Sequence, residues 1–254
     1  MINKYQKLIK SLHQKKFRSS ENLFLVEGGK SILELFSAEN NFNKISIQAL
    51  FYTEHFAQEN QELLPLFQKQ VAHSELVTQT ILHSVGTLQT NENAIAVAKM
   101  PANFPLKVEN EMVLALADIR DPGNLGTIIR IADWYGIRKL ICSETTTDFY
   151  SPKVIAASMG SFLRVKPFYC DLAQYLAMQT DMGIYGAFLK GKNIYEQKFE
   201  QRGIIVIGNE SNGIPDDLVG YIPNKITIPR FGEAESLNAG IATAIICDNW
   251  RRGA

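Results

Sequence analysis

Residues 113–137 read VLALADIRDPGNLGTIIRIADWYGI, and this stretch decides the fold of most of the chain. Its first five residues are all apolar, which is typical of a strand buried on both faces of a parallel sheet. The DIRDPGNLG that follows contains a Pro-Gly pair and predicts a tight turn, and residues 127–135 predict a helix. The stretch therefore indicates an α/β unit, in which ligands bind beyond the carboxyl ends of the strands.

The same alternation of strands and helices continues to the C-terminus. Further strands are predicted at 139–142, 165–168, 184–188, 204–207 and 226–228, and helices at 153–159, 172–180 and 237–250. Residues 1–100 predict a smaller α/β unit, with strands at 22–26, 44–52 and 95–99 and helices at 28–36 and 62–70. Pro101 and Pro105 mark residues 101–110 as a linker. We therefore expect a small N-terminal α/β domain over 1–100 and a parallel-sheet α/β domain over 111–254.

The charge of the chain is balanced, with 26 basic and 26 acidic residues among 254. This balance excludes binding of a polyanion through bulk positive charge, so any nucleic-acid contact must come from a local patch. The first twenty residues contain no acid and predict a helix with an apolar stripe and a basic face. The basic residues are Lys4, Lys7, Lys10, Lys15, Lys16 and Arg18. This face is either an ordinary solvated surface or an arm that contacts phosphates.

Cysteine usage and hydropathy indicate a cytoplasmic protein without metal. The three cysteines are odd in number, widely spaced and without a C-x-x-C pair, which disfavours a disulfide framework or a structural zinc site. No run approaches the roughly 20 apolar residues of a membrane span, and the N-terminal residues do not resemble a secretory signal. We expect no membrane and no metal partner.

Three polar loops that follow apolar strands carry the candidate chemistry. In the first, residues 118–126, Asn124 is a candidate helix cap and Arg130 lies on the helix that follows. The loop matches neither G-x-G-x-x-G nor the P-loop pattern, which disfavours a dinucleotide or ATP site. By itself it is equally typical of a capped helix with a surface arginine.

The other two loops are also glycine-containing. Residues 207–215 place a single carboxylate, Glu210, between Gly208 and Gly213, an arrangement as typical of a polar turn as of a ligand site. Residues 228–238 lead into a helix that starts with small residues, and Ser236 is its candidate N-cap. Taken separately, neither loop distinguishes a binding site from local structure.

Taken together, the three loops resemble the three motifs of the SpoU family of RNA 2′-O-ribose methyltransferases, TrmH-like members of the SPOUT superfamily. The matching stretches are DPGNLGTIIRIADWYGI, IVIGNESNGI and ITIPRFGEAESLNAGIATAI, and SPKVIAASMGSFLRV between them also fits. The resemblance extends from about Val113 to the C-terminus. The departure Ala239-Gly240-Ile241, where the family usually has Val-Ser-Val, is expected to affect packing only. Residues 1–100 resemble the family's L30e-like substrate-binding domain through the opening helix and NLFLVEGGKSILE.

The resemblance implies S-adenosylmethionine as cofactor, bound in a deep trefoil knot of the parallel-sheet domain. Threaded chains are very rare, so the knot rests on the resemblance and not on the strand pattern. By the same carry-over, main-chain groups of Gly208, Ile228 and Leu237 hold the cofactor, with Gly213, Ser236 and Asn238 beside them. The family also works as a homodimer through this domain.

The resemblance assigns catalysis to Arg130, assisted by Asn124 and Glu210. Family proposals make the arginine a general base. Because arginine stays protonated in proteins, we favour a guanidinium that clamps the substrate and stabilises the developing alkoxide, oriented by Asn124 and Glu210. The expected phosphate contacts are Lys15, Lys16, Arg18 and Arg120.

The RNA substrate stays open between rRNA, which the front domain favours by analogy, and tRNA. The role of the modification, housekeeping or antibiotic resistance, is open as well. A base methyltransferase of the wider superfamily is the first alternative, and alkali-resistant nucleotides would distinguish ribose methylation from it. A non-catalytic RNA-binding factor is the second, and failure to bind S-adenosylmethionine would favour it. A nucleotide hydrolase is remote, because the P-loop lysine is missing.

Overall fold

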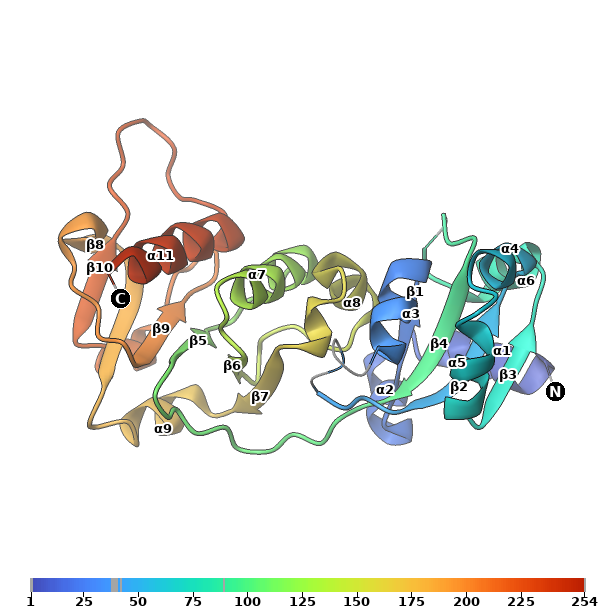
Figure 1. Ribbon diagram of the computed structural model, residues 1–254. Helices are drawn as coiled ribbons and strands as arrows, with labels where there is room; N and C mark the ends of the chain where they lie inside the picture. The colour runs from blue at the N-terminus through green and yellow to red at the C-terminus, as the bar shows by residue number, and fades with distance from the viewer. Residues whose placement is uncertain (1, 38–40, 42, 89, 254) are drawn as a thin grey trace. The chain divides into compact units, whose positions relative to one another are not determined.

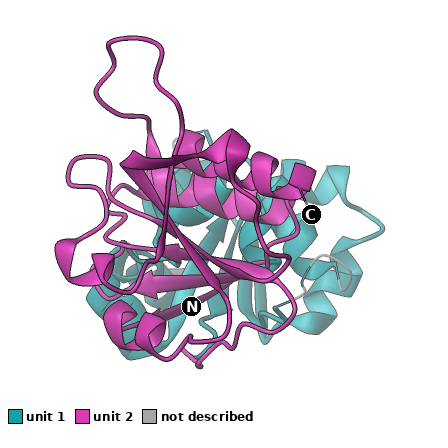
Figure 2. Ribbon diagram, turned by 90° about the vertical axis from the view of Figure 1, so that its left-hand side faces the viewer, with its two compact units in different colours: residues 1–102, 148–164 teal, residues 103–147, 165–254 magenta. Residues whose placement is uncertain are grey.

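The computed structural model describes residues 2–37, 41, 43–88 and 90–253, and the chain divides into two compact units. Unit 1 comprises Met1–Ala102 together with Asp148–Arg164, and unit 2 comprises Asn103–Thr147 together with Val165–Ala254 (Figure 2). Residues 148–164, which we expected with the C-terminal domain, therefore group with the N-terminal residues. The chain passes from one unit to the other three times.

Unit 2 is built on a six-stranded sheet in the order β10-β8-β9-β5-β6-β7, in which every neighbouring pair is parallel. Its strands are β5 (Met112–Leu116), β6 (Lys139–Ser143), β7 (Lys166–Cys170), β8 (Gly183–Asn193), β9 (Gly203–Ile207) and β10 (Asn224–Thr227). The central strands β5 and β9 are buried along their whole length. The predicted parallel-sheet α/β domain is confirmed, and its unbroken apolar runs are the buried central strands.

The helices of unit 2 are α7 (Pro122–Trp134), α9 (Leu172–Ala177), α10 (Asp216–Val219) and α11 (Ala239–Gly253). The closing helix α11 packs against α7, as Figure 1 shows. This contact brings the start of α11, which follows the strand β10 at one edge of the sheet, next to the loop that leaves the central strand β5.

Both of these helices begin differently from the sequence prediction. α7 starts at Pro122 instead of 127, and the carboxylate of Asp121 accepts the N–H of Asn124 at 2.8 Å. Proline suits the first helical position because its missing N–H would have no partner there. Asn238 caps α11, since its Oδ1 accepts the N–H of Gly240 at 2.9 Å and of Ile241 at 3.3 Å. The predicted caps Asn124 and Ser236 are therefore wrong.

Unit 1 contains a mixed four-stranded sheet in the order β1-β4-β2-β3, antiparallel except for the β2–β3 pair. The strands are β1 (Leu23–Glu27), β2 (Ile47–Tyr52), β3 (His73–Leu76) and β4 (Ala94–Lys99). The helices are α1 (Ile2–Ser11), α2 (Lys15–Glu21), α3 (Gly29–Phe36), α4 (Glu54–Glu59), α5 (Leu64–Gln70) and α6 (Gln79–Val85). The predicted opening helix is thus two helices.

The segment 148–164 leaves the sheet of unit 2 between β6 and β7 and packs on β1. It contains α8 (Pro152–Ser158) and the short helix η1 (Ser161–Leu163). Two ion pairs lie at its ends, Arg18–Asp148 at 2.5 Å and Arg164–Glu34 at 3.0 Å. Buried aromatic rings fill the space between, because Phe24 of β1 contacts Tyr150 and Phe162. No described helix is long and apolar enough to cross a membrane.

Candidate functional site

The three polar loops meet at the carboxyl edge of the six-stranded sheet. The first two follow β5 and β9, which are hydrogen-bonded neighbours, so these loops leave the sheet side by side. The third, residues 228–238, connects β10 to α11 and projects from the sheet as an open loop in Figures 1 and 2. Its far end returns to the first loop because α11 packs on α7.

One side chain, that of Asn124, connects all three loops. Its Nδ2 donates a short hydrogen bond to Oε1 of Glu210 in the second loop, and its Oδ1 accepts from Nδ2 of Asn238 at 2.7 Å in the third. Asn124 is half-buried at the start of α7, where Asp121 holds its N–H. These bonds bring the three loops together at Asn124, Glu210 and Asn238.

The second loop folds back on itself. Asn209 and Gly213 exchange main-chain hydrogen bonds of 3.0 and 2.8 Å, and Gly213 adopts a left-handed φ of 69°. A Cβ at Gly208 would collide with the main chain of Gly213 and Ile214. Gly208 is therefore required by the closure of its own loop.

The main-chain groups assigned to the cofactor are open to a ligand. Within the described residues, no main-chain N–H or C=O of Gly208, or of residues 228–237, hydrogen-bonds another main-chain group. Ile228 is half-buried, and Ser236 and Leu237 are exposed. The carbonyl of Ala234 accepts from Nη1 of Arg230 at 3.3 Å. Main-chain groups of Gly208, Ile228 and Leu237 without a main-chain partner among the described residues suit the adenine and amino-acid parts of S-adenosylmethionine, so these residues fit the cofactor.

Arg130 is exposed on α7, and it has no hydrogen-bond or ion-pair partner among the described residues. Asn124 and Glu210 bond to each other and not to its guanidinium, contrary to our expectation. Arg130 lies six residues after Asn124 on α7. At about 100° per residue, its side chain leaves the helix about 240° around the axis from that of Asn124 and therefore on a different face. The guanidinium is available to a substrate.

Two of the predicted phosphate contacts are already engaged. Arg18 is buried, and its Nε and Nη2 donate to Asp148 at 2.9 and 2.5 Å while its Nη1 donates to the carbonyls of Leu12 and His13. Its prediction as an RNA contact is wrong, because a solvent-excluded guanidinium with a carboxylate partner has a structural role. Arg120 is exposed but pairs with Asp118 at 2.9 Å.

The two lysines of the predicted basic face are exposed. Lys15 and Lys16 lie on α2, and the Lys16 ammonium lies 4.7 Å from the centre of the Phe17 ring. Both charges are therefore open to solvent and to a polyanion.

An open cleft of about 400 Å³ lies beyond the ends of β5, β6 and β7, beside the first loop. Its walls include Asp118, Arg120, Ser143, Glu144, Cys170, Asp171 and Leu218. Burial, with the nearby carboxylates of Asp171 and Glu144, raises the pKa of the Cys170 thiol to about 11. The thiol of Cys170 is therefore protonated at neutral pH. The volume of the cleft is within the range of small-ligand sites.

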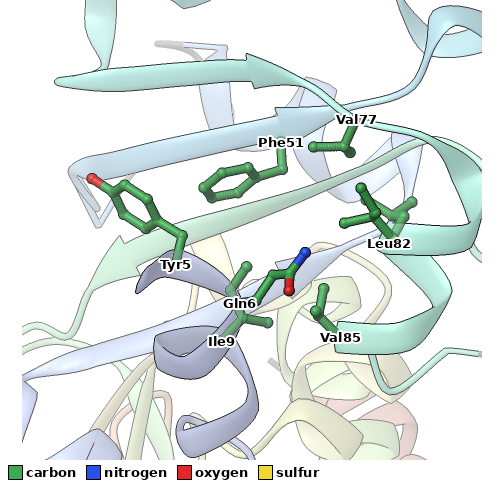
Figure 3. A pocket seen from close by; sticks show the side chains of 8 residues that line it. Tyr5, Gln6, Ile9, Phe51, Val77, Leu82 and Val85 are labelled. Atoms are coloured by element: carbon green, nitrogen blue, oxygen red, sulfur yellow. The ribbon is translucent and has the colours of Figure 1, made fainter. Parts of the chain in front are cut away.

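A second hollow lies in unit 1 and is only about 10 Å³. Figure 3 shows its apolar lining, with Tyr5 and Phe51 on one side and Leu82 and Val85 on the other. A space of this size holds at most about one water molecule, so we regard it as a packing gap. No group of three or more potential metal ligands occurs in the described part of the chain.

Comparison with known proteins agrees with this geometry. The family model described as SpoU rRNA Methylase matches residues 111–248, more than half of the 254 residues. The chain belongs to the SpoU rRNA methylase family. A second model, described as an MRM3-like substrate binding domain, matches residues 3–96. This SpoU protein therefore combines a methyltransferase domain with a substrate-binding domain.

Several known proteins are similar to this SpoU protein over almost its whole length. The 23S rRNA (guanosine(2553)-2′-O)-methyltransferase RlmP of Bacillus subtilis is 26% identical over 240 residues, which cover 93% of this chain and 92% of RlmP. A TrmH-family structure from Porphyromonas gingivalis is 33% identical with a TM-score of 0.83, covering 98% and 97% of the two chains. An AdoMet-bound rRNA methyltransferase from Sinorhizobium meliloti is 26% identical with a TM-score of 0.84, covering 98% and 94%. Family and neighbours indicate an RNA methyltransferase with S-adenosylmethionine as cofactor.

The sequence reasoning missed one residue of the site. Asn209 donates from Nδ2 to the main-chain oxygen of Asp118 at 2.9 Å and so ties the second loop to the first. The available signal was an asparagine directly between the loop glycine Gly208 and the carboxylate Glu210.

Proposed function

We propose that this protein transfers a methyl group from S-adenosylmethionine to a ribose 2′-hydroxyl of 23S rRNA. The observation that carries the proposal is the contact of Asn124 with both Glu210 and Asn238, which gathers the three loops beside main-chain groups that have no main-chain partner in the described part of the chain. The activity of RlmP, which matches over 93% of this chain, supports rRNA as the substrate.

The protein's part in the reaction is to hold the reactants and stabilise charge. The cofactor supplies an electrophilic methyl carbon on a sulfonium. S-adenosylmethionine, held by main-chain groups of Gly208, Ile228 and Leu237, would supply the methyl group to the 2′-oxygen and leave as S-adenosylhomocysteine, while the hydroxyl proton would pass to solvent water. The exposed guanidinium of Arg130 binds the neighbouring phosphate and the developing alkoxide through its planar fork. In this assignment, Asn124 and Glu210 fix the loops and do not orient the arginine.

RNA recognition is assigned to unit 1 and to the edge of the cleft. The match of residues 3–96 to a substrate-binding domain supports this, together with the exposed Lys15 and Lys16. Arg120 can contact RNA only if its ion pair with Asp118 breaks and a phosphate takes the place of the carboxylate. The 2′-hydroxyl itself distinguishes RNA from DNA.

Assembly and location complete the proposal. Large apolar side chains are exposed on the two packed helices of unit 2, with Trp134 of α7 84% exposed and Ile241 of α11 53% exposed. We assign to this domain a homodimer interface that would cover these two side chains. We also propose that this domain contains the trefoil knot and that the protein modifies rRNA in the cytoplasm.

The test compares rRNA and tRNA from cells with and without this gene by mapping 2′-O-methyl sites. We expect one ribose methylation in 23S rRNA to disappear and to return with the wild-type gene. Arg130→Ala should not restore it, although the purified variant binds S-adenosylmethionine with an affinity close to that of the wild type. Arg130→Lys should also be poor, because lysine lacks the fork. Loss of a tRNA methylation instead would overturn the rRNA assignment, and an active Lys variant would overturn the clamp.

A further inference from the structure

Both polar atoms of the Asn209 side-chain amide form hydrogen bonds with the two central loops. Its Nδ2 donates to the main-chain oxygen of Asp118 at 2.9 Å. Its Oδ1 accepts the N–H of Ser211 at 2.8 Å and of Asn212 at 3.4 Å within its own loop. A single amide therefore shapes the second loop and fastens it to the first.

The acceptor of this bond, Asp118, has an unusual backbone. Its φ of 63° lies in the left-handed region, which is uncommon for a residue other than glycine. Its N–H donates to Oγ of Ser143 at 3.0 Å, and its carboxylate pairs with Arg120. The main-chain oxygen of Asp118 accepts from Asn209, so the main-chain N–H, the main-chain oxygen and the carboxylate of this residue are all bonded. Several such contacts are needed to maintain an unfavourable backbone conformation.

The residue after Asn209 is Glu210, whose carboxylate accepts from Asn124. The distance between the two loops at this point is therefore set by two adjacent bonds, one to the main chain of the first loop and one to its helix. We propose that Asn209 is a positioning residue, whose amide N–H on Asp118 sets the alignment of Glu210, Asn124 and Asn238 for methyl transfer. This inference rests on the proposed function.

Asn209→Asp tests the role of the donor with little change of shape. A carboxylate keeps the acceptor for Ser211 and Asn212, but it has no hydrogen to give to the oxygen of Asp118. Asn212→Asp is the matched control, because it makes the same change of charge in the same loop, and the Asn212 side chain is exposed with no hydrogen bond among the described residues.

The assay is methylation of transcribed 23S rRNA with labelled S-adenosylmethionine, beside calorimetry of cofactor binding. At pH 8 we expect Asn209→Asp to lower kcat about 10²-fold, the cost of a misplacement of about 1 Å, with KM for RNA and Kd for the cofactor changed less than about threefold. Asn212→Asp should stay within about twofold of the wild type.

The pH profile distinguishes positioning from a general structural defect. Only the protonated form of the introduced carboxyl can donate to Asp118, and the carboxylates of Asp118 and Glu210 favour that form, opposed by Arg120. The ratio of variant to wild-type kcat should therefore rise from about 10⁻², the activity that the deprotonated form keeps, as the pH falls toward the introduced pKa. A ratio independent of pH, or an equal loss in Asn212→Asp, would overturn the proposal.

A measurement on the wild type covers the case in which the variant does not fold. The side-chain amide protons of Asn209 should exchange with solvent more slowly than those of Asn212, because one of them is bonded to Asp118. Equal exchange would overturn the proposal. A wild type that binds the cofactor but methylates no RNA contradicts the proposed function, whatever the exchange result shows for Asn209.

Discussion

Replacing the buried Arg18 by methionine should destabilise unit 1 strongly and should act through stability, not through RNA contact. The side chain is 3% exposed and makes four hydrogen bonds, two to Asp148 and one each to the carbonyls of Leu12 and His13. Methionine fills much of the volume but leaves the carboxylate and both carbonyls without this donor. Removing one partner of a buried ion pair typically costs about 3–5 kcal/mol.

Hydrogen exchange read by mass spectrometry measures this loss within unit 1. Each 1.4 kcal/mol is a factor of ten in an equilibrium, so amides of β1 and β4 should exchange at least about 10²-fold faster in Arg18→Met. Both tryptophans, Trp134 and Trp250, belong to unit 2. Their fluorescence therefore monitors the other unit during the same unfolding experiment.

Lys16→Met is the matched control, because Lys16 is exposed on the same helix α2. It should leave the exchange rates unchanged, weaken RNA binding and flatten the dependence of that binding on salt. The double variant Arg18→Met with Asp148→Asn should lose less stability than the sum of the single losses. Unchanged exchange in Arg18→Met, together with a reduced salt slope like that of Lys16→Met, would refute the structural role of Arg18.

Three further outcomes are expected. Gly208→Ala should weaken cofactor binding and stability more than Gly213→Ala. An added Cβ collides with main chain at Gly208, whereas at Gly213 it adds only the strain of a left-handed backbone, about 1–2 kcal/mol. Comparable losses in calorimetry and melting would contradict this. Cys170, with its pKa raised to about 11, should be alkylated slowly at pH 8 and about tenfold faster per pH unit up to pH 10. The buried Cys142 and Cys247 should stay unmodified. Equal labelling of all three thiols, measured by mass spectrometry, would contradict the fold around them. Trp134→Lys should give a monomer in light scattering, and an unchanged mass would argue against dimerisation through α7.

Much of the parallel sheet could be predicted because its central strands are continuous apolar runs. Residues 112–116 and 203–207 are buried along their whole length, so hydrophobicity alone identifies them. Short or polar elements gave no such signal. β3, with the sequence HSEL, and α6 were not predicted, because their stability comes from neighbours such as β2 and α1 and not from local pattern.

The residues of the candidate site could be predicted from the sequence, but the hydrogen bonds that they form could not. The motifs identified Asn124, Glu210 and Asn238, yet the bonds between them depend on α11 packing against α7, which no spacing in the sequence reveals. The same limit explains Arg18, which lies in a basic stretch but meets a carboxylate 130 residues further along the chain. Charge counted along the sequence does not reveal which cations are buried.

The position of the transferred methyl group shows whether the protein methylates a ribose or a base. Purified protein, labelled S-adenosylmethionine and transcribed 23S rRNA are incubated, and the RNA is then hydrolysed with alkali. We predict label in alkali-resistant dinucleotides, because a methylated 2′-oxygen can no longer attack the adjacent phosphate, and no label with Arg130→Ala. Label recovered only in single nucleotides would place the methyl group on a base and contradict the account.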